Sequence, residues 1–240
     1  MIVHLLITVL FPAILFTMPV EGKEYKHKLI YLNTYNTVNI RGAVNDDNVA
    51  KWSRELAKLK SGRGRHKPVY LVIDSPGGSI TAGLNFINFV NQYKNVHTIT
   101  MDAASMGSGI VQGVRGNRYY LPNSIMMFHR AKASVSGQVE EGELEQRLKM
   151  IKKLVLYMEN INASRMSMPL KSYKDKVLNE WWLFGDDIGK ANAGDSMVFL
   201  KCSDKLTKQR EEVSYRSIFG LVKFLYSKCP LIKSPVSLRR

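Results

Sequence analysis

The stretch 69-VYLVIDSPGGSITAG-83 decides the fold of this chain. Val69 to Asp74 is a run of β-branched and aliphatic residues, typical of a buried strand. The Gly77-Gly78 turn follows, and the segment from Ser79 to Tyr93 predicts a helix. Another apolar run, Val96 to Met101, predicts a second strand. A strand, a crossover helix and a second strand form one right-handed unit of a parallel sheet.

The same alternation continues on both sides of this unit. Strands are predicted at 37–44 and, as a pair, at 118–121 and 125–128. Helices are predicted at 49–59 and from Ser105 onward. We therefore expect one α/β domain with a mostly parallel sheet, in which ligands gather at the carboxyl ends of the strands.

Two helix amino termini are expected to meet at those carboxyl ends. One lies within "DSPGGSITAG", just after Gly77 and Gly78, and the other lies within 102-DAASMGSG-109, at Ser105. Backbone N–H groups at helix amino termini favour negative charge. A hydroxyl beside such donors suits acyl transfer, which requires a nucleophile and an oxyanion site. Taken alone, however, a serine that opens a helix is most often a cap.

His129 is the candidate general base. It ends the apolar strand "SIMMF" and lies 24 residues after Ser105, with a helix and a strand between them to return the chain. The alternative is that His129 is only a boundary residue of its strand.

Three segments together resemble a known family. "IDSPGGSITAGL", "AASMGSG" and "RYYLPNSIMMFH" are similar, in order and spacing, to the proteolytic subunit of the Clp protease in the ClpP/crotonase superfamily. The resemblance runs from about Leu29 to Met197. It implies a ClpP/crotonase-like spiral of αββ repeats with a protruding handle helix, a Ser-His-acid triad, and a homo-oligomer that encloses its active sites.

Position by position, the resemblance assigns Ser105 as nucleophile and His129 as base. It assigns the N–H groups of Gly78 and Met106 to the oxyanion hole. The family's third triad member is an aspartate, whereas here "LNEWWLFGDD" offers Glu180. A glutamate can orient an imidazole, but its longer side chain needs a shifted backbone or rotamer. The alternative is that Glu180 is a solvated acid at a helix end.

The segment from Val139 to Ala163 occupies the place of the family's handle helix. Its apolar residues recur at helical spacing with charges between them. They are Leu144, Leu148, Ile151, Val155, Met158 and Ile161. We expect this helix to join subunits; the alternative is that it lies on its own core.

The amino-terminal segment, residues 1–22, is almost unbroken apolar sequence. We interpret it as a signal peptide, with an uncleaved membrane anchor as the alternative. Both interpretations place residues 23–200, the peptidase domain, outside the cytosol, in the periplasm or secreted, or anchored and facing the periplasm.

Cys202 and Cys229 suit an oxidising compartment, where a disulfide could join residues 201–240 to the domain. Two buried thiols are the alternative. Their spacing matches no metal site, and we expect neither a metal nor a cofactor.

The net charge of +15 is concentrated partly in residues 201–240, a basic carboxy-terminal tail with ten Lys and Arg. No stacking platform or recognition helix accompanies this charge, so we do not expect nucleic-acid binding. A solvated basic face, or association with an anionic membrane surface, is favoured instead.

The sequence thus predicts a serine peptidase of the cell envelope that acts on peptides or loosely folded proteins. Because the compartments outside the cytosol supply no ATP, we expect it to act without an ATP-driven unfoldase. A Ser-Lys membrane protease like the signal-peptide peptidases is one alternative, with Lys149, Lys152 or Lys153 as the base. A catalytically silent binding or assembly subunit is another.

Overall fold

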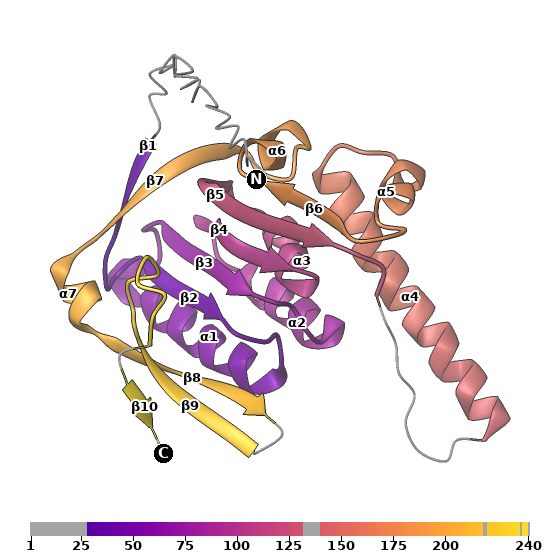
Figure 1. The fold of residues 1–240 in the computed structure, drawn as a ribbon, viewed down its shortest axis with the longest axis horizontal. Coiled ribbons are helices and arrows are strands. Elements are labelled where there is room, and N and C mark those ends of the chain that lie inside the picture. Colours follow the sequence, from indigo (N-terminus) through magenta and orange to yellow (C-terminus); the bar gives the residue numbers. More distant parts are fainter. Residues whose placement is uncertain (1–27, 132–139, 218–219, 236, 240) are drawn as a thin grey trace, which may run out of the picture.

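The computed structural model describes residues 28–131, 140–217, 220–235 and 237–239. Within them, a seven-stranded sheet has the order β1-β7-β5-β4-β3-β2, and β6 pairs with β5 outside this path. All neighbours along the path run parallel, and only β6 is antiparallel. The expected α/β class with a mainly parallel sheet is confirmed (Figure 1).

The strands of this sheet are β1 (Lys28–Leu32), β2 (Thr37–Arg41), β3 (Val69–Ser75), β4 (Val96–Ala104), β5 (Arg118–Phe128), β6 (Trp181–Phe184) and β7 (Ser196–Cys202). The helices are α1 (Asp46–Leu59), a 3-10 turn η1 (Gly62–Gly64), α2 (Ile80–Val90), α3 (Met106–Gly113), α4 (Glu141–Arg165), α5 (Leu170–Lys176), α6 (Asp186–Lys190) and α7 (Asp204–Lys208). A smaller sheet contains β8 (Arg210–Ser217), β9 (Gly220–Ser227) and β10 (Ser237–Arg239).

Helices α1, α2 and α3 pack on one face of the large sheet (Figure 1). Trp52 of α1 and Phe86 of α2 are fully buried there and meet edge to face, with ring centroids 5.6 Å apart. A second cluster, with Ile30, Ile99 and Val198, fills the opposite face. Both faces of the central strands are covered, as expected for a parallel sheet whose strands are nearly continuous apolar runs.

The two strands predicted at 118–121 and 125–128 are one strand, β5. Both halves pair with β4, and the register shifts between Thr100 and Asp102. Pro122 and Asn123 are exposed at this irregularity. The prediction of a strand pair was wrong because a proline that faces solvent at a bulge does not interrupt the ladder on either side.

Helix α4 projects from the body of the molecule (Figure 1). Val139, where the sequence predicts its start, lies outside the described residues. The apolar residues expected on one face of this helix differ in burial along its length. Leu144 and Leu148 are exposed on the projecting half, whereas Met158 is buried against the core. The helix therefore both lies on its own core and extends beyond it.

The segment expected to be a basic tail is folded. The boundary after Leu200 falls inside β7, and the residues that follow form α7 and the antiparallel sheet β10-β9-β8. Glu211 of β8 is buried, and its Oε1 accepts hydrogen bonds from Arg41 Nη1 and Asn39 Nδ2, each at 3.0 Å. Burial raises the pKa of Glu211, although the positive charge of Arg41 acts to lower it. Removing one partner of such a pair costs roughly 3–5 kcal/mol, so this contact anchors the small sheet to β2.

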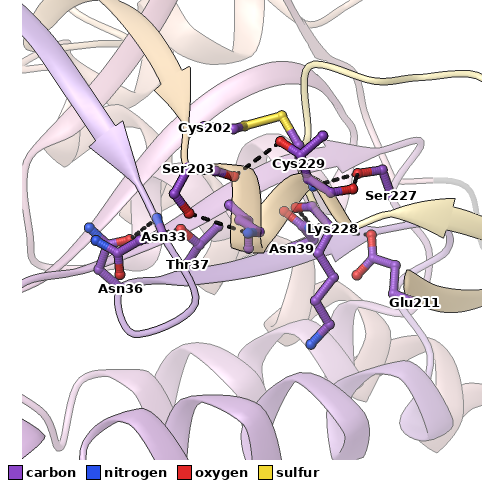
Figure 2. Close-up of a disulfide and its surroundings, with 12 residues drawn as sticks. Asn33, Asn36, Thr37, Asn39, Cys202, Ser203, Glu211, Ser227, Lys228 and Cys229 are labelled. Atoms are coloured by element: carbon purple, nitrogen blue, oxygen red, sulfur yellow. Dashed lines mark hydrogen bonds between the residues drawn. A yellow bond between two sulfur atoms is a disulfide. The ribbon is translucent and has the colours of Figure 1, made fainter. Parts of the chain in front are cut away.

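Cys202 and Cys229 form a disulfide in the structure, with Cα atoms 5.8 Å apart (Figure 2). It joins the last residue of β7 to Cys229, which lies two residues after the end of β9. The small sheet is thus fixed to the body both by the disulfide and by Glu211. The apolar segment 1–22 lies outside the described residues, and no described helix has the length and apolar character needed to cross a membrane.

Replacing Cys202 and Cys229 by Ser is expected to lower the free energy of unfolding by about 3.5 kcal/mol, because the unfolded chain regains the entropy of the closed loop. The loop spans 27 residues. Urea denaturation of the wild type with and without reductant measures the effect, and the double variant, which reductant should not affect, is the control. Two reactive thiols in unreduced, denatured protein purified from an oxidising compartment would contradict the bridge.

Candidate active site

Ser105 lies in the sharp turn between β4 and α3. Its backbone has φ 54° and ψ −120°, a conformation that non-glycine residues rarely adopt. The Ser105 N–H donates to the Met127 carbonyl of β5 at 2.9 Å, and its own carbonyl accepts from Gly109 N–H at 3.0 Å. The adjacent strand and the first turn of α3 therefore hold the strained turn in place.

The Ser105 hydroxyl lies against His129 rather than the helix. Although Ser105 is the N-cap residue of α3, its side chain makes no capping hydrogen bond. Instead Ser105 Oγ lies 2.8 Å from His129 Nε2. This distance is within the range that a general base needs to take a hydroxyl proton. The Ser105 side chain therefore does not act as an ordinary helix cap in this structure.

The Gly77-Gly78 turn packs directly against Ser105. A Cβ on Gly77, where φ is 92°, would lie 2.6 Å from Ser105 Cβ and 2.8 Å from Met106 N. A Cβ on Gly78, where φ is 149°, would lie 2.3 Å from the Val44 carbonyl oxygen. Both positions therefore need glycine, for conformation and for space.

Within the part of the chain that the structure describes, the N–H groups of Gly78 and Met106 have no hydrogen-bond acceptor, as the expected oxyanion site requires. Val44 bonds to the neighbours of Gly78, through its N–H to the Gly77 carbonyl and its carbonyl to the Ser79 N–H. Met106 is the first residue of α3, where N–H groups have no partner within the helix. Among the described residues, neither N–H donates a hydrogen bond to the protein.

A cavity opens beside Ser105 and His129. Its apolar wall includes Ile80 and Phe128 from the body, and α4 closes the other side. The full lining is Ile80, Ser105, Met106, Gly109, Phe128, His129, Ala131, Val155, Met158, Glu159, Asn162 and Tyr173. The body-packed half of α4 thus forms one wall of the site.

Three polar residues of this cavity, Glu159, Asn162 and Tyr173, were not identified from the sequence. Asn162 Nδ2 donates to the Tyr173 hydroxyl at 2.8 Å, while Asn162 Oδ1 is buried without a hydrogen-bond partner among the described residues. Burial raises the pKa of Tyr173 to about 12, so its hydroxyl stays neutral at physiological pH. Asn162 falls between apolar positions of the α4 pattern, and Tyr173 carries no motif; only tertiary packing brings them to Ser105.

Glu180 lies near His129 without a hydrogen bond to it. Both residues line a second hollow, together with Asn179. Glu180 Oε2 accepts from Trp182 Nε1 at 3.1 Å, and no hydrogen bond between Glu180 and the His129 ring occurs within the described residues. The role of Glu180 as third triad member stays a prediction.

The three lysines of the alternative mechanism are not part of the cavity. Lys149, Lys152 and Lys153 are exposed on α4. Of the described residues, those of α4 that line the cavity begin at Val155. The position of the serine therefore favours histidine over lysine as its proton acceptor.

Replacing Gly77 by Ala should lower the reactivity of Ser105 toward a fluorophosphonate probe about a hundredfold, because the added Cβ displaces both Ser105 and the Met106 N–H. The second-order labelling rate measures this. Gly62→Ala is the matched control, since Gly62 also has a positive φ, of 52°, but has no atom within 4 Å of an added Cβ. Equal labelling rates for both variants would contradict the assigned packing.

Comparison with known proteins identifies the family to which this chain belongs. The family model described as Clp protease matches residues 21–190, more than half of the chain. A relative from Streptococcus mutans serotype c, named ATP-dependent Clp protease proteolytic subunit, is 32% identical over 145 residues, which cover 58% of this chain and 72% of the relative.

Relatives of the same name from Streptococcus pyogenes serotype M5 and Streptococcus equi subsp. equi are each 28% identical over 145 residues. In both cases the match covers 59% of this chain and 74% of the relative. The chain therefore belongs to the Clp protease family and is a peptidase.

Proposed function

We propose that this chain is a serine peptidase that hydrolyses peptides or loosely folded proteins in the cell envelope. The observation that carries the proposal is the 2.8 Å contact between Ser105 Oγ and His129 Nε2, in a turn where the serine side chain does not cap its helix. The family membership supports the same reaction class.

In the proposed mechanism, the neutral His129 ring carries its proton on Nδ1, so Nε2 accepts the Ser105 proton as Oγ attacks the substrate carbonyl. The N–H groups of Gly78 and Met106 stabilise the oxyanion of the tetrahedral intermediate. His129 then gives the proton to the departing amine. A water molecule, deprotonated by the same ring, hydrolyses the acyl-enzyme and regenerates Ser105.

The cavity supports a preference for an apolar side chain next to the scissile bond. Phe128, Val155 and Met158 are among its apolar lining residues, and apolar burial favours binding by about 25 cal/mol per Å². Glu159 adds a carboxylate, a hydrogen-bond acceptor, to the same lining. A side chain with an apolar stem and a polar hydrogen at its end fits both features.

The envelope location is part of the proposal. The apolar segment 1–22 and the Cys202–Cys229 disulfide support export, because disulfides persist in oxidising compartments. Such compartments contain no ATP to drive an unfoldase. The peptidase is therefore proposed to work alone, unlike the ATP-dependent enzymes after which its relatives are named.

Ser105→Ala should abolish both fluorophosphonate labelling and peptide hydrolysis, and His129→Ala should lower kcat by about 10⁴ or more, because both groups act on the same proton. Labelling on a denaturing gel and hydrolysis of a fluorogenic peptide measure these effects. The variant with Lys149, Lys152 and Lys153 replaced by Met is the control and should stay active. Full activity in His129→Ala would overturn the assignment of the base.

Glu180→Gln tests the third triad position within the same assay. If Glu180 orients the imidazole, kcat falls at least about a hundredfold while the substrate KM changes little. Asn179→Ala, beside it in the same hollow, is the matched control. An unchanged kcat in Glu180→Gln would leave Ser105 and His129 in place and remove Glu180 from the mechanism.

We further propose that the projecting half of α4 joins copies of this chain into a homo-oligomer. Leu144 and Leu148, one helical turn apart, are 37% and 41% exposed there. Large apolar side chains gathered on one exposed surface are typical of protein interfaces. The family resemblance supports a second copy as the occupant.

Replacing Leu144 and Leu148 by Glu should produce smaller particles, since a charge buried without a partner costs several kcal/mol. Light scattering of the wild type and the variant measures the change. Val155 is unsuitable for this test because it also lines the cavity. Lys149→Glu, on the same half of the helix, is the control for added acidic charge. A wild-type chain that is monomeric at micromolar concentration would contradict the oligomer alone.

A further inference from the structure

Another cavity, at the end of the sheet opposite to Ser105, is lined by cations without any carboxylate. Its lining residues are Thr34, Tyr35, Lys58, Leu59, Ser61, Arg63, Gly64, Lys67, Lys205 and Gln209. We call this set the basic pocket. Four of its members are Lys or Arg, and none is Asp or Glu. A charge-balanced surface usually mixes both signs, so this pocket is a local concentration of positive potential.

The cations of the basic pocket come from two separate parts of the chain. Lys58 belongs to the last turn of α1, and Arg63 and Lys67 follow in and after η1. Lys205 belongs to α7, almost 140 residues later. Within the described residues none of the four forms an ion pair with a carboxylate. No ion pair within the described residues therefore neutralises these four cations.

The wall formed by residues 33–36 is held rigid by its own hydrogen bonds. Asn33 N–H donates to Asn36 Oδ1 at 2.8 Å, and Tyr35 N–H donates to Asn33 Oδ1 at 2.9 Å. Asn36 Nδ2 donates to the Tyr31 carbonyl at 2.9 Å. The Tyr35 ring then lies 5.6 Å from Lys205 Nζ, and the cation–π contact orients this ammonium group.

The wall formed by α7 is held by the disulfide (Figure 2). Ser203, directly after Cys202, donates its N–H to the Leu32 carbonyl at 2.8 Å, and its hydroxyl caps α7 at Leu206. The Lys228 N–H, next to Cys229, donates to the Gln209 carbonyl at 2.9 Å. These contacts therefore fix the positions of Lys205 and Gln209, which lie across the basic pocket from the loop between α1 and β3.

The opposite wall is the loop after α1, which carries Arg63 and Lys67. The buried Lys60 donates from Nζ to the Lys67 carbonyl at 2.8 Å and fixes the loop that carries Arg63. The Ser61 hydroxyl is used within this wall, since it donates to the Lys58 carbonyl at 2.8 Å. The cations and the Thr34 hydroxyl of the lining match the acceptor oxygens of a phosphate group, which carries about −1.5 to −2 charge as a monoester.

We propose that the basic pocket binds a phosphate group that carries more than one negative charge, from a soluble oligophosphate or from a phosphomonoester lipid headgroup. Arg63 supplies the planar fork that contacts two phosphate oxygens at once, and Lys58, Lys67 and Lys205 supply point charges around it. The site is separate from Ser105 and His129, and it gives this peptidase a second ligand-binding site.

Titration calorimetry with inorganic pyrophosphate, at ionic strength held constant with sodium chloride, tests the proposal. The wild type should bind saturably, and the pair Arg63→Gln with Lys205→Gln should bind at least tenfold more weakly. The control pair, Lys149→Gln with Lys171→Gln, removes the same charge from exposed sites outside the pocket and should stay within twofold of the wild type. Far-ultraviolet circular dichroism melting curves verify that both pairs fold.

Cosedimentation with phosphatidylcholine vesicles, with and without phosphatidic acid, distinguishes the two sources. Binding to phosphatidic acid that the pocket pair loses and pyrophosphate displaces supports a lipid headgroup. Saturable pyrophosphate binding without vesicle binding supports a soluble oligophosphate. The proposal is overturned if the wild type does not bind pyrophosphate saturably, or if the pocket pair and the control pair lose affinity equally.

Discussion

The guanidinium of Arg118 joins the ends of four elements, and the active-site geometry depends on it. Nη1 donates to Gln112 Oε1 of α3 at 2.6 Å and to the carbonyls of Arg165 and Asn192, each at 3.0 Å. The backbone N–H and the side chain of Arg118 also bind the Asp195 carboxylate. Burial acts to raise the pKa of Asp195, but the hydrogen bonds and charge of Arg118 outweigh it and hold the pKa below its usual value. The pair therefore stabilises the fold at neutral pH and loses this contribution as the pH falls through the lowered pKa.

Arg118 connects α3 and β5 at the ends opposite to those that carry Ser105 and His129. Ser105 begins α3 and His129 follows β5, whereas Arg118 begins β5 and bonds to the last turn of α3. A shift of α3 along β5 would therefore break the hydrogen bond between Arg118 and Gln112 as well as the contact between Ser105 and His129. The strain at Ser105 is held in the same way, because Met127 of β5 binds its N–H. Gly185, between β6 and α6, has nearly the same backbone angles, φ 50° and ψ −119°, so the tight strand-to-helix turn recurs in the fold and only one copy carries a hydroxyl.

None of the described residues after β7 lines the cavity beside Ser105, so these carboxy-terminal residues change other parts of the surface. The small sheet is fixed to β2 through Glu211 and to β7 through the disulfide, as Figure 2 shows for the cysteines and their neighbours. Their basic residues therefore take defined positions. Lys205, which charge counting alone assigns to a solvated tail, faces the cations of the α1–β3 loop across a cavity. The high net charge of the chain is partly organised into one site rather than spread over a flexible segment.

The sequence by itself determined the parallel sheet, the glycine turn and the positions of Ser105 and His129, because local periodicity and strand-end chemistry are written in consecutive residues. It also indicated α4, since a 25-residue amphipathic helix has a long periodic signal. Only the tertiary structure decided that residues 118–128 are one strand, that Asn162 and Tyr173 complete the cavity, and that Lys205 lies across from Arg63. These features depend on contacts between segments far apart in the chain, and no local pattern encodes which distant side chains meet. The geometry of Glu180 depends on both the sequence and the tertiary structure. The motif places Glu180 near His129, whereas the surrounding fold determines its side-chain rotamer, which here is directed to Trp182.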